Sequence, residues 1–234
     1  MANVDACEAN PQMAQQVNAD LPGIIGEACY RHSIRLVHIS TDAVFDGSTG
    51  NYTENDAPNP LSVYASTKLA GENAVLSANP EALVTRVNFY GWSAAGNRSL
   101  AENFVNTLAA DKEMMGFTDV EFCPMNVLDL SALLVEAAGM DLHGRYHLVG
   151  PEAMSKYEFG RRIAEKFGFN ASLIKPMSVK DSGLKAARSP RLTLSTEKIR
   201  NALAHELPDF SGDTGRKTFA DHRQNRADHA PTQL

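Results

Sequence analysis

This 234-residue chain has few cysteines, no excess of basic residues and no long apolar run, and each of these shortages excludes a kind of protein. Cys7, Cys29 and Cys123 are odd in number, far apart and without metal-ligand spacing, so reduced, partly buried thiols are expected rather than a disulfide framework. No apolar stretch approaches the roughly 20 residues that a membrane-spanning helix needs. The first residues lack a basic segment followed by an apolar run, so no secretory signal is expected and a cytoplasmic location is the default.

The chain also lacks an excess of basic residues. Its formal net charge is −6, which argues against a general nucleic-acid-binding or acidic-membrane surface, because such partners attract basic faces. With 43% hydrophobic and 21% charged residues, the composition is that of an ordinary globular protein. The length suits one large α/β domain, or a main domain with a small appendage.

The first part of the chain predicts a helix, a strand and a second helix. Residues 1–10 are small and polar and follow no strand, whereas residues 11–32 show a helical apolar stripe with a kink expected near Pro22 and Gly23. The stripe consists of Met13, Val17, Leu21, Ile24, Ile25 and Ala28. Residues 36–39 predict a buried strand, and residues 42–60 are a turn-rich loop. Asn59 and Pro60 predict the start of a helix that runs to about residue 77.

The rest of the chain continues the alternation less regularly. We expect strands at residues 82–87, 120–122 and 146–149, and helices at residues 100–111, 127–138, 155–167 and 195–203, the third of these capped by Ser155 with Glu158. Strand and helix alternate as far as about residue 90, which predicts right-handed βαβ units and a doubly wound parallel sheet. From residue 211 the chain is polar and charged, so a disordered tail is expected.

The candidate chemistry lies in the stretch from residue 36 to residue 72. Tyr64 and Lys68 are four residues apart, so on a helix both side chains share one face. A nearby ammonium lowers the pKa of a phenol, which can then exchange a proton with a carbonyl or alcohol oxygen. Ser40 and Thr41 end the preceding strand, where open α/β sheets place their ligand contacts. Tyr-x-x-x-Lys alone is more often a solvated helix face, and it is the order strand, Ser-Thr-Asp, loop, Pro-Leu, Tyr-x-x-x-Lys that indicates a site.

With these motifs the chain resembles the extended short-chain dehydrogenase/reductase superfamily and, within it, sugar-nucleotide reductases of the dTDP-4-dehydrorhamnose reductase type. The resemblance runs from residue 1 to about residue 210. Its motifs are HISTDAVFDG at residues 38–47, NPLSVYASTKLAGE at 59–72, RVNFYGW at 86–92, GRYHLVG at 144–150, SKYEF at 155–159 and LTLSTEK at 192–198.

The resemblance implies a reaction and roles for particular residues. The reaction is reduction of a 4-keto sugar nucleotide with NADP or NAD as cofactor. Tyr64 is then the catalytic acid, and Lys68 is its pKa partner and a ligand of the cofactor ribose. Thr41, with Ser40 beside it at the cofactor, polarises the substrate carbonyl.

Further expectations concern the pocket and the partners. Asn88 and Phe89 would line the nicotinamide and sugar pocket, whereas Ala43 stands where many relatives carry a second Tyr. The partner is a nucleotide-sugar substrate, with no nucleic acid and no membrane, and a homodimer is left open.

The glycine-rich strand-turn-helix that holds the cofactor diphosphate in the family is missing. Gly23 and Gly26 fall inside a predicted helix and follow no strand, so helix packing explains them better. We therefore expect an N-terminally truncated Rossmann-like fold, with an uncovered sheet edge, apolar helix faces and negligible NADPH affinity. The expected division is a remainder of the Rossmann domain at 1–90, a smaller, mainly substrate-binding α/β subdomain with some return to the core at 91–210, and a tail at 211–234.

Two alternatives remain open at this stage. The regulatory β subunit of methionine adenosyltransferase is similar across the same motifs, so a non-catalytic subunit is a second hypothesis. An inactive fragment is the third.

Several other residues fit structural roles better than chemical ones. His143 and His147 are favoured as structural residues over a metal pair, Asp42 and Asp46 are favoured as turn residues, and Arg86 is favoured as half of a salt bridge. Lys156 and Tyr157 begin a helix that could face either the substrate nucleotide or solvent.

Overall fold

The computed structural model describes residues 1–183 and 189–210, so the expected tail from residue 211 lies outside the described residues. A three-stranded parallel sheet forms the main part of the chain, with β2 (Leu83–Val87) between β1 (Val37–Thr41) and β7 (Gly144–Leu148). All five residues of β2 are buried, including the polar Thr85 and Arg86, as expected of a central strand in a parallel sheet. The predicted α/β fold with a parallel sheet is confirmed.

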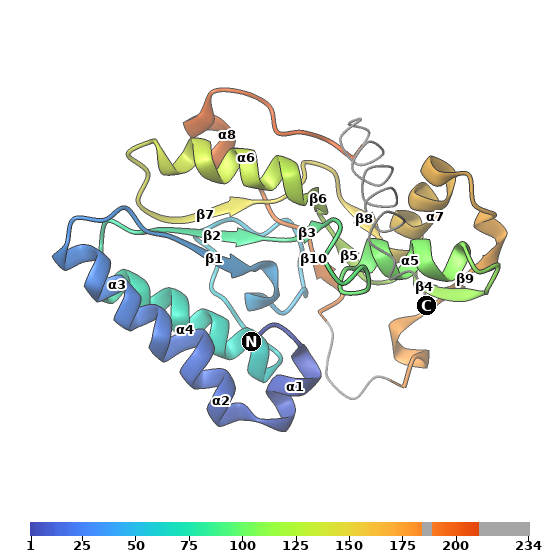
Figure 1. Ribbon diagram of the computed structural model, residues 1–234, viewed down its shortest axis with the longest axis horizontal. Coiled ribbons are helices and arrows are strands. Elements are labelled where there is room, and N and C mark those ends of the chain that lie inside the picture. The colour runs from blue at the N-terminus through green and yellow to red at the C-terminus, as the bar shows by residue number, and fades with distance from the viewer. Residues whose placement is uncertain (184–188, 211–234) are drawn as a thin grey trace, which may run out of the picture.

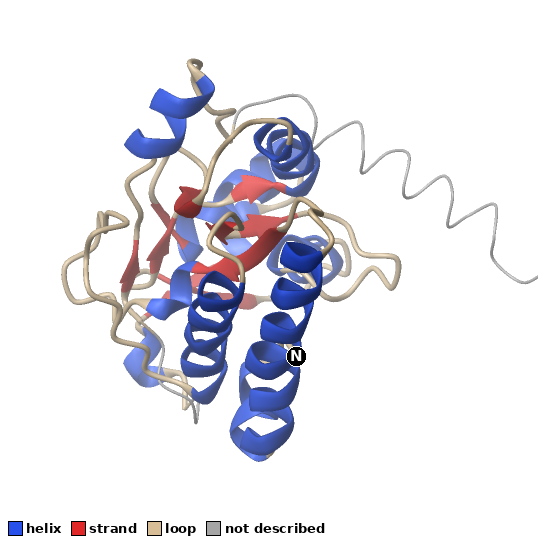
Figure 2. Cartoon of the chain, turned by 90° about the vertical axis from the view of Figure 1, so that its left-hand side faces the viewer, coloured by secondary structure: helices blue, strands red, loops and turns tan. Residues whose placement is uncertain are grey.

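Helices cover both faces of this sheet (Figures 1 and 2). On one face lie α3 (Leu21–Arg31) and α4 (Val63–Ala78), preceded by the short helices α1 (Val4–Ala9) and α2 (Pro11–Gln15). On the other face lie α6 (Val127–Ala138) and α8 (Glu197–Leu203). This two-sided arrangement is the doubly wound architecture expected from the alternation of elements. Within the described residues, no helix has the length and apolarity to cross a bilayer.

The predicted helix over residues 11–32 is present, and it contains a π-helical turn close to the expected kink at Pro22 and Gly23. That turn (Gln16–Asp20) lies between α2 and α3. Pro22 has no N–H for the carbonyl of Asn18, four residues earlier, and this carbonyl faces Gly71 of α4 instead. A Cβ atom at position 71 would lie 2.1 Å from that oxygen, so only glycine permits this approach of the two helices.

The apolar stripe of this helix faces solvent. Small residues, among them Gly23 and Gly26, make the contact with α4. The large residues of the stripe are exposed instead: Met13, Val17, Leu21, Ile24 and Ile25. Strand β1 is an edge strand in the described sheet, and Ile39 in its middle is also exposed. The expected uncovered edge and apolar helix faces are therefore present.

Helix α4 begins three residues later than the sequence predicts. Its N-cap is Ser62, whose hydroxyl accepts from the backbone N–H of Ala65. Asn59 instead donates its side-chain amide to Asp46 in the preceding loop, 2.9 Å away. The prediction that Asn59 and Pro60 start the helix was wrong because this tertiary contact uses the expected cap.

A second unit follows the sheet, at the right of Figure 1, and has its own core. It contains α5 (Leu100–Leu108) and α7 (Lys156–Phe167), both near the predicted positions and capped by Ser99 and Ser155. Short strand pairs complete it: β3 (Phe89–Tyr90) with β6 (Met125–Asn126), β4 (Met114–Phe117) with β9 (Ile174–Met177), and β5 (Glu121–Phe122) between β8 (Met154–Ser155) and β10 (Arg191–Leu192). Phe104, Phe122 and Phe159 pack at its centre.

Three short 3-10 turns complete the described elements: Asp42–Val44, Ala171–Leu173 and Val179–Asp181. The first turn directly follows β1. It therefore sets the direction in which the chain leaves the sheet at the candidate site.

Candidate functional site

A pocket of about 110 Å³ lies where β1 and β2 end, between the sheet and the second unit. Tyr64 from α4, Asn88 after β2 and Lys156 from α7 all line it. Its remaining lining residues are Val4, Ala43, Leu61, Ser62, Val120, Glu121, Phe122, Ser189 and Leu192. Parallel strands bring their carboxyl ends to one edge, which is how residues far apart in the sequence meet here.

Tyr64 lies in the first turn of α4, with its phenol toward the end of β1. Burial raises its pKa above the ordinary value of 10, and a hydrogen bond with the hydroxyl of Thr41 acts in the opposite direction. The expected lowering of this pKa by Lys68 is therefore not what the structure shows. At neutral pH the raised pKa keeps the phenol protonated, which is the form that can give a proton to a carbonyl oxygen.

Lys68 lies one helical turn after Tyr64 and is partly buried. Its ammonium donates to the carbonyl oxygen of Ile39 in the edge strand β1, at 2.7 Å. Burial lowers the pKa of Lys68, while the carboxylate of Glu72 acts to raise it. An ammonium carries three N–H donors, and within the described part of the chain two of those of Lys68 remain for other acceptors.

Buried Thr41 and Asp42 and half-buried Asn88 form a hydrogen-bonded group beside Tyr64. The Thr41 hydroxyl donates to one carboxylate oxygen of Asp42 at 3.1 Å, and the Asn88 amide donates to the other at 2.5 Å. Burial raises the pKa of Asp42 to about 6, although these hydrogen bonds and the charge of Lys156 act to lower it. Thr41 also accepts the backbone N–H of Ala43 at 3.2 Å.

Ser40 points away from this pocket. Its hydroxyl donates to Glu72 on α4 at 2.6 Å, and the same carboxylate is held by Arg86 and by Arg145. The salt bridge favoured for Arg86 is thus present: its Nη2 atom lies 2.8 Å from Oε2 of Glu72, and both side chains are buried. The hydroxyl hydrogen of Ser40 is used in this network, so the contacts of Ser40 do not support the expected role beside the cofactor.

Phe89 also lies apart from Tyr64. Although Asn88 lines the pocket of Tyr64, Phe89 lines a separate cavity of about 490 Å³ together with Trp92 and Arg98. Successive residues after a strand point in opposite directions, which explains why these two neighbours separate. The structure therefore brings together Thr41, Tyr64 and Asn88, with Lys68 one turn away, and leaves out Ser40 and Phe89.

The sequence analysis missed the place of Asp42 in the site. It was interpreted as a turn residue, and it does open the 3-10 turn that follows β1. Its side chain is nevertheless buried against Asn88, a contact across strands that local turn chemistry does not reveal. Lys156, left open between substrate and solvent, lines the same pocket.

The remaining chemical candidates have structural partners. Asp46 organises its loop, and hydrogen bonds from Tyr52, Ser48 and Asn59 lower its pKa. His147 is buried against Arg86, whereas His143 pairs with Asp141 at 2.9 Å.

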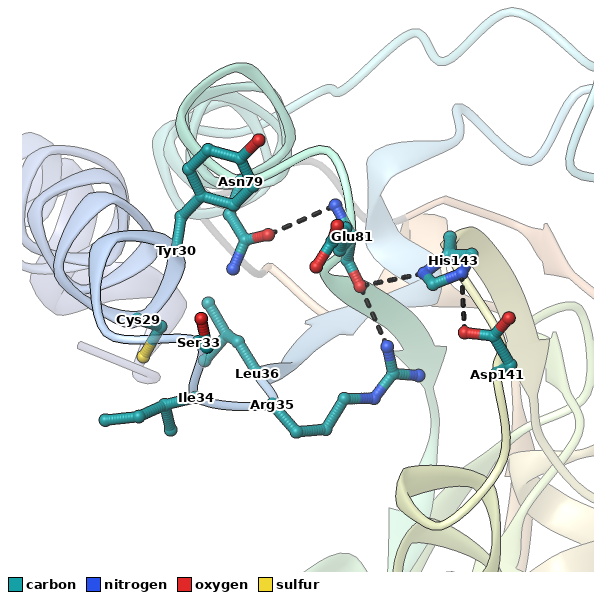
Figure 3. Close-up of a pocket in the computed structure, with 10 residues that line it drawn as sticks. All are labelled: Cys29, Tyr30, Ser33, Ile34, Arg35, Leu36, Asn79, Glu81, Asp141 and His143. Carbon is teal, nitrogen blue, oxygen red and sulfur yellow. Dashed lines mark hydrogen bonds and ion pairs between the residues drawn. The ribbon is translucent and has the colours of Figure 1, made fainter.

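A larger cavity of about 430 Å³ lies at the opposite, amino ends of the strands (Figure 3). Its polar groups are hydrogen-bonded to one another: the guanidinium of Arg35 and the ring of His143 both contact the backbone carbonyl oxygen of Glu81, at 2.8 and 3.0 Å. These groups are already paired, so this cavity is a weaker candidate site than the pocket of Tyr64.

The residues fit only one end of a nicotinamide cofactor. Lys68, with spare N–H donors near Tyr64, suits the hydroxyls of a ribose. Gly23 and Gly26 do not suit a diphosphate, because they lie within α3 and added Cβ atoms would meet Ala74 and Val75 of α4 at 3.1 and 3.3 Å. Within residues 1–183 and 189–210, no glycine-rich turn follows a strand to hold phosphates.

Comparison with known proteins gives a consistent set of relatives. The family model described as "RmlD substrate binding domain" matches residues 1–221. A probable low-salt glycan biosynthesis reductase, Agl14 of Haloferax volcanii, is 34% identical over 216 residues, which is 90% of this chain and 72% of that protein. The dTDP-4-dehydrorhamnose reductase of Mycobacterium tuberculosis is 34% identical over 203 residues, covering 84% of this chain and 66% of that one.

Two further matches broaden the set. The β subunit of methionine adenosyltransferase 2 from Bos taurus is 33% identical over 198 residues, covering 80% of this chain and 58% of that one. The crystal structure of the dTDP-4-dehydrorhamnose reductase of Bacillus anthracis with NADP superposes with a TM-score of 0.86 at 24% identity. That match covers 94% of this chain and 78% of the other and shows the same fold.

Proposed function

The chain belongs to the RmlD substrate-binding domain family, and from this premise we propose that it carries the proton-donating site of a nucleotide-sugar reductase. The reaction is the NAD(P)H-dependent reduction of a 4-keto sugar nucleotide of the dTDP-4-dehydrorhamnose kind, with Tyr64 as the proton donor. The observation that carries the proposal is the meeting of Tyr64 and Asn88 at one pocket beside the carboxyl ends of β1 and β2, with Thr41 hydrogen-bonded to Tyr64.

The protein's own residues would divide the work as follows. The pocket binds the sugar so that its keto oxygen reaches the Tyr64 hydroxyl, which donates its proton as the carbonyl becomes an alcohol. Lys68 would hold the hydroxyls of the nicotinamide ribose, and its charge would stabilise the phenolate that remains. A bound nicotinamide cofactor supplies the hydride.

The proposed role of Tyr64 is tested by Tyr64→Phe, which keeps the ring and removes the transferable proton. In a parent protein that also carries the glycine-rich cofactor turn, we expect turnover of dTDP-4-dehydrorhamnose, followed by NADPH absorbance, to fall by about 10²–10⁴-fold, the range for general acid catalysis. Affinity for the product dTDP-rhamnose should stay within about threefold, because the packing of the ring is kept. Tyr52→Phe, which alters a tyrosine of the loop after β1, is the matched control. Equal turnover of Tyr64→Phe and the parent would refute the role.

A second candidate is supported by the similarity to the β subunit of methionine adenosyltransferase 2. In that case the chain would act through a partner protein and without turning over substrate. A pull-down with the catalytic subunit of the same organism distinguishes the two. Capture of that subunit, with no nucleotide-sugar turnover, would favour the regulatory function.

A further inference from the structure

Asp42 touches both polar groups around Tyr64, and the chemistry of its carboxylate restricts theirs. An ionised carboxylate can only accept hydrogen bonds. Asn88, 2.5 Å away, must therefore offer its NH₂ group to Asp42, and its amide orientation is fixed by that requirement. Thr41 has a single hydroxyl hydrogen, and this hydrogen is directed to the second oxygen of Asp42.

This arrangement determines what the pocket offers to a ligand. With its nitrogen turned to Asp42, Asn88 leaves its carbonyl oxygen for the pocket, and within the described residues this oxygen has no protein donor. Thr41 likewise has only an oxygen lone pair left for the Tyr64 side, because its hydrogen is used. Tyr64 therefore donates to Thr41 while no ligand is bound, and its hydrogen turns to the pocket when a ligand oxygen replaces Thr41 as the acceptor. In that liganded arrangement the pocket has an acceptor at Asn88 and a donor at Tyr64.

We propose that Asp42 is a positioning residue that fixes this polarity and so selects which way round the sugar binds, an inference that rests on the proposed reductase function. A keto oxygen can only accept a hydrogen bond, so it is repelled by the Asn88 oxygen and directed to the Tyr64 hydroxyl. A sugar hydroxyl, which can donate, takes the Asn88 side. The reacting carbonyl is thereby placed at the proton donor rather than at a neighbouring carbon.

The surroundings of Asp42 agree with a fixed orientation. The side chain is 3% exposed, so water does not compete for its oxygens. The other charged or titratable groups near it are Lys156 of α7, Tyr64 of α4 and Cys123 before β6. Of these only Lys156 carries a charge opposite to that of the carboxylate at neutral pH. In the part of the chain that the structure describes, no guanidinium pairs with Asp42 as Arg86 does with Glu72.

The decisive variants are Asp42→Asn and the exchange Asp42→Asn with Asn88→Asp. In the single variant, position 42 offers one acceptor and one donor, so either Asn88 or Thr41 must reverse its polarity. In the exchange, the new amide at position 42 donates to the new carboxylate at position 88, which keeps an acceptor oxygen toward the pocket. The net charge then equals that of the parent. We expect calorimetry with dTDP-rhamnose to show roughly 10–100-fold weaker binding for the single variant and recovery to within about threefold for the exchange.

A second measurement needs no substrate. With ¹⁵N-labelled asparagine, one side-chain amide proton of Asn88 should lie downfield and exchange more slowly than those of exposed Asn97, and Asp42→Asn should change it. Undiminished thermal stability of Asp42→Asn would separate positioning from folding.

Each outcome has one meaning. Parent-like binding by Asp42→Asn, no recovery in the exchange, or an Asn88 amide that exchanges like Asn97 would overturn the assignment. A parent chain that shows the protected amide but binds no nucleotide sugar would refute the proposed function while supporting the role of Asp42 in orienting Asn88.

Discussion

Replacing Glu72 with alanine should cost this protein a large part of its stability. The Glu72 carboxylate is completely buried and accepts from Ser40 at 2.6 Å, from Arg145 at 2.9 Å and from Arg86 at 2.8–3.2 Å. Arg86 is itself 1% exposed. Without the carboxylate, its guanidinium keeps, among the described residues, the contacts with His147 at 3.4 Å and with the face of Phe45.

The magnitude follows from the unpaired charge. Removing one partner of a buried ion pair costs about 3–5 kcal/mol, against a total stability of about 5–15 kcal/mol for a typical domain. Urea unfolding measures it: the midpoint should fall by more than about 1 M with an unchanged slope. Glu27→Ala is the control, since its pair with Arg31 is exposed and should contribute less than about 1 kcal/mol.

A double variant sharpens the test. Glu72→Met with Arg86→Met removes both charges, so it should be more stable than Glu72→Ala, in which one charge is stranded. A loss below about 1 kcal/mol for Glu72→Ala, or a double variant as unstable as the single one, would show that the network does not hold α4 to β2.

Two further predictions concern the exposed stripe and the buried Asp42. Ile24 is 63% exposed, so Ile24→Lys should change the free energy of unfolding by less than about 0.5 kcal/mol and should reduce self-association in light scattering. Val75→Ala in the core is the control and should cost about 2 kcal/mol. A comparable loss of stability for Ile24→Lys would mean that the stripe is covered. Because the pKa of Asp42 is raised from 3.8 to about 6, the folded state binds an extra proton between these values, and the stability contributed by this group falls as the pH rises through that window. Asp42→Asn should remove this slope and stabilise the protein near pH 7 by up to about 3 kcal/mol, and unfolding curves with the same pH dependence as the parent would contradict it.

Local patterns predicted the frame of the site. The apolar run before Ser40 predicts β1, and the spacing of Tyr64 and Lys68 predicts one helix face, because both depend on residues close in the sequence. Helix α6 begins and ends at the predicted residues for the same reason. Strands β4 and β9 were not predicted, since each is short, contains Gly116 or Pro176, and exists only through pairing with the other.

What the sequence did not predict are contacts between elements. Ser40 and Thr41 both carry hydroxyls at the strand end, yet one joins the network of Glu72 and the other meets Tyr64. The alternation of side chains along a strand gives opposite directions but not which one faces the pocket. The amide of Asn88 is oriented by a carboxylate 46 residues away, which no local rule reveals.

Two buried carboxylates lie around β1, those of Glu72 and Asp42, and their hydrogen-bond partners explain why the first stabilises the fold and the second does not. Burial works to raise the pKa of Glu72, but the hydrogen bonds from Arg86, Ser40 and Arg145 outweigh it, so its pKa is lowered and its charge stabilises the fold above pH 4.5. For Asp42, burial outweighs the hydrogen bonds from Asn88, Thr41 and the backbone N–H of Ala43 and the charge of Lys156, so its pKa rises and its charge destabilises the fold at neutral pH. A carboxylate that reduces stability contributes in another way, and the polarity it imposes on Asn88 and Thr41 beside Tyr64 provides that contribution.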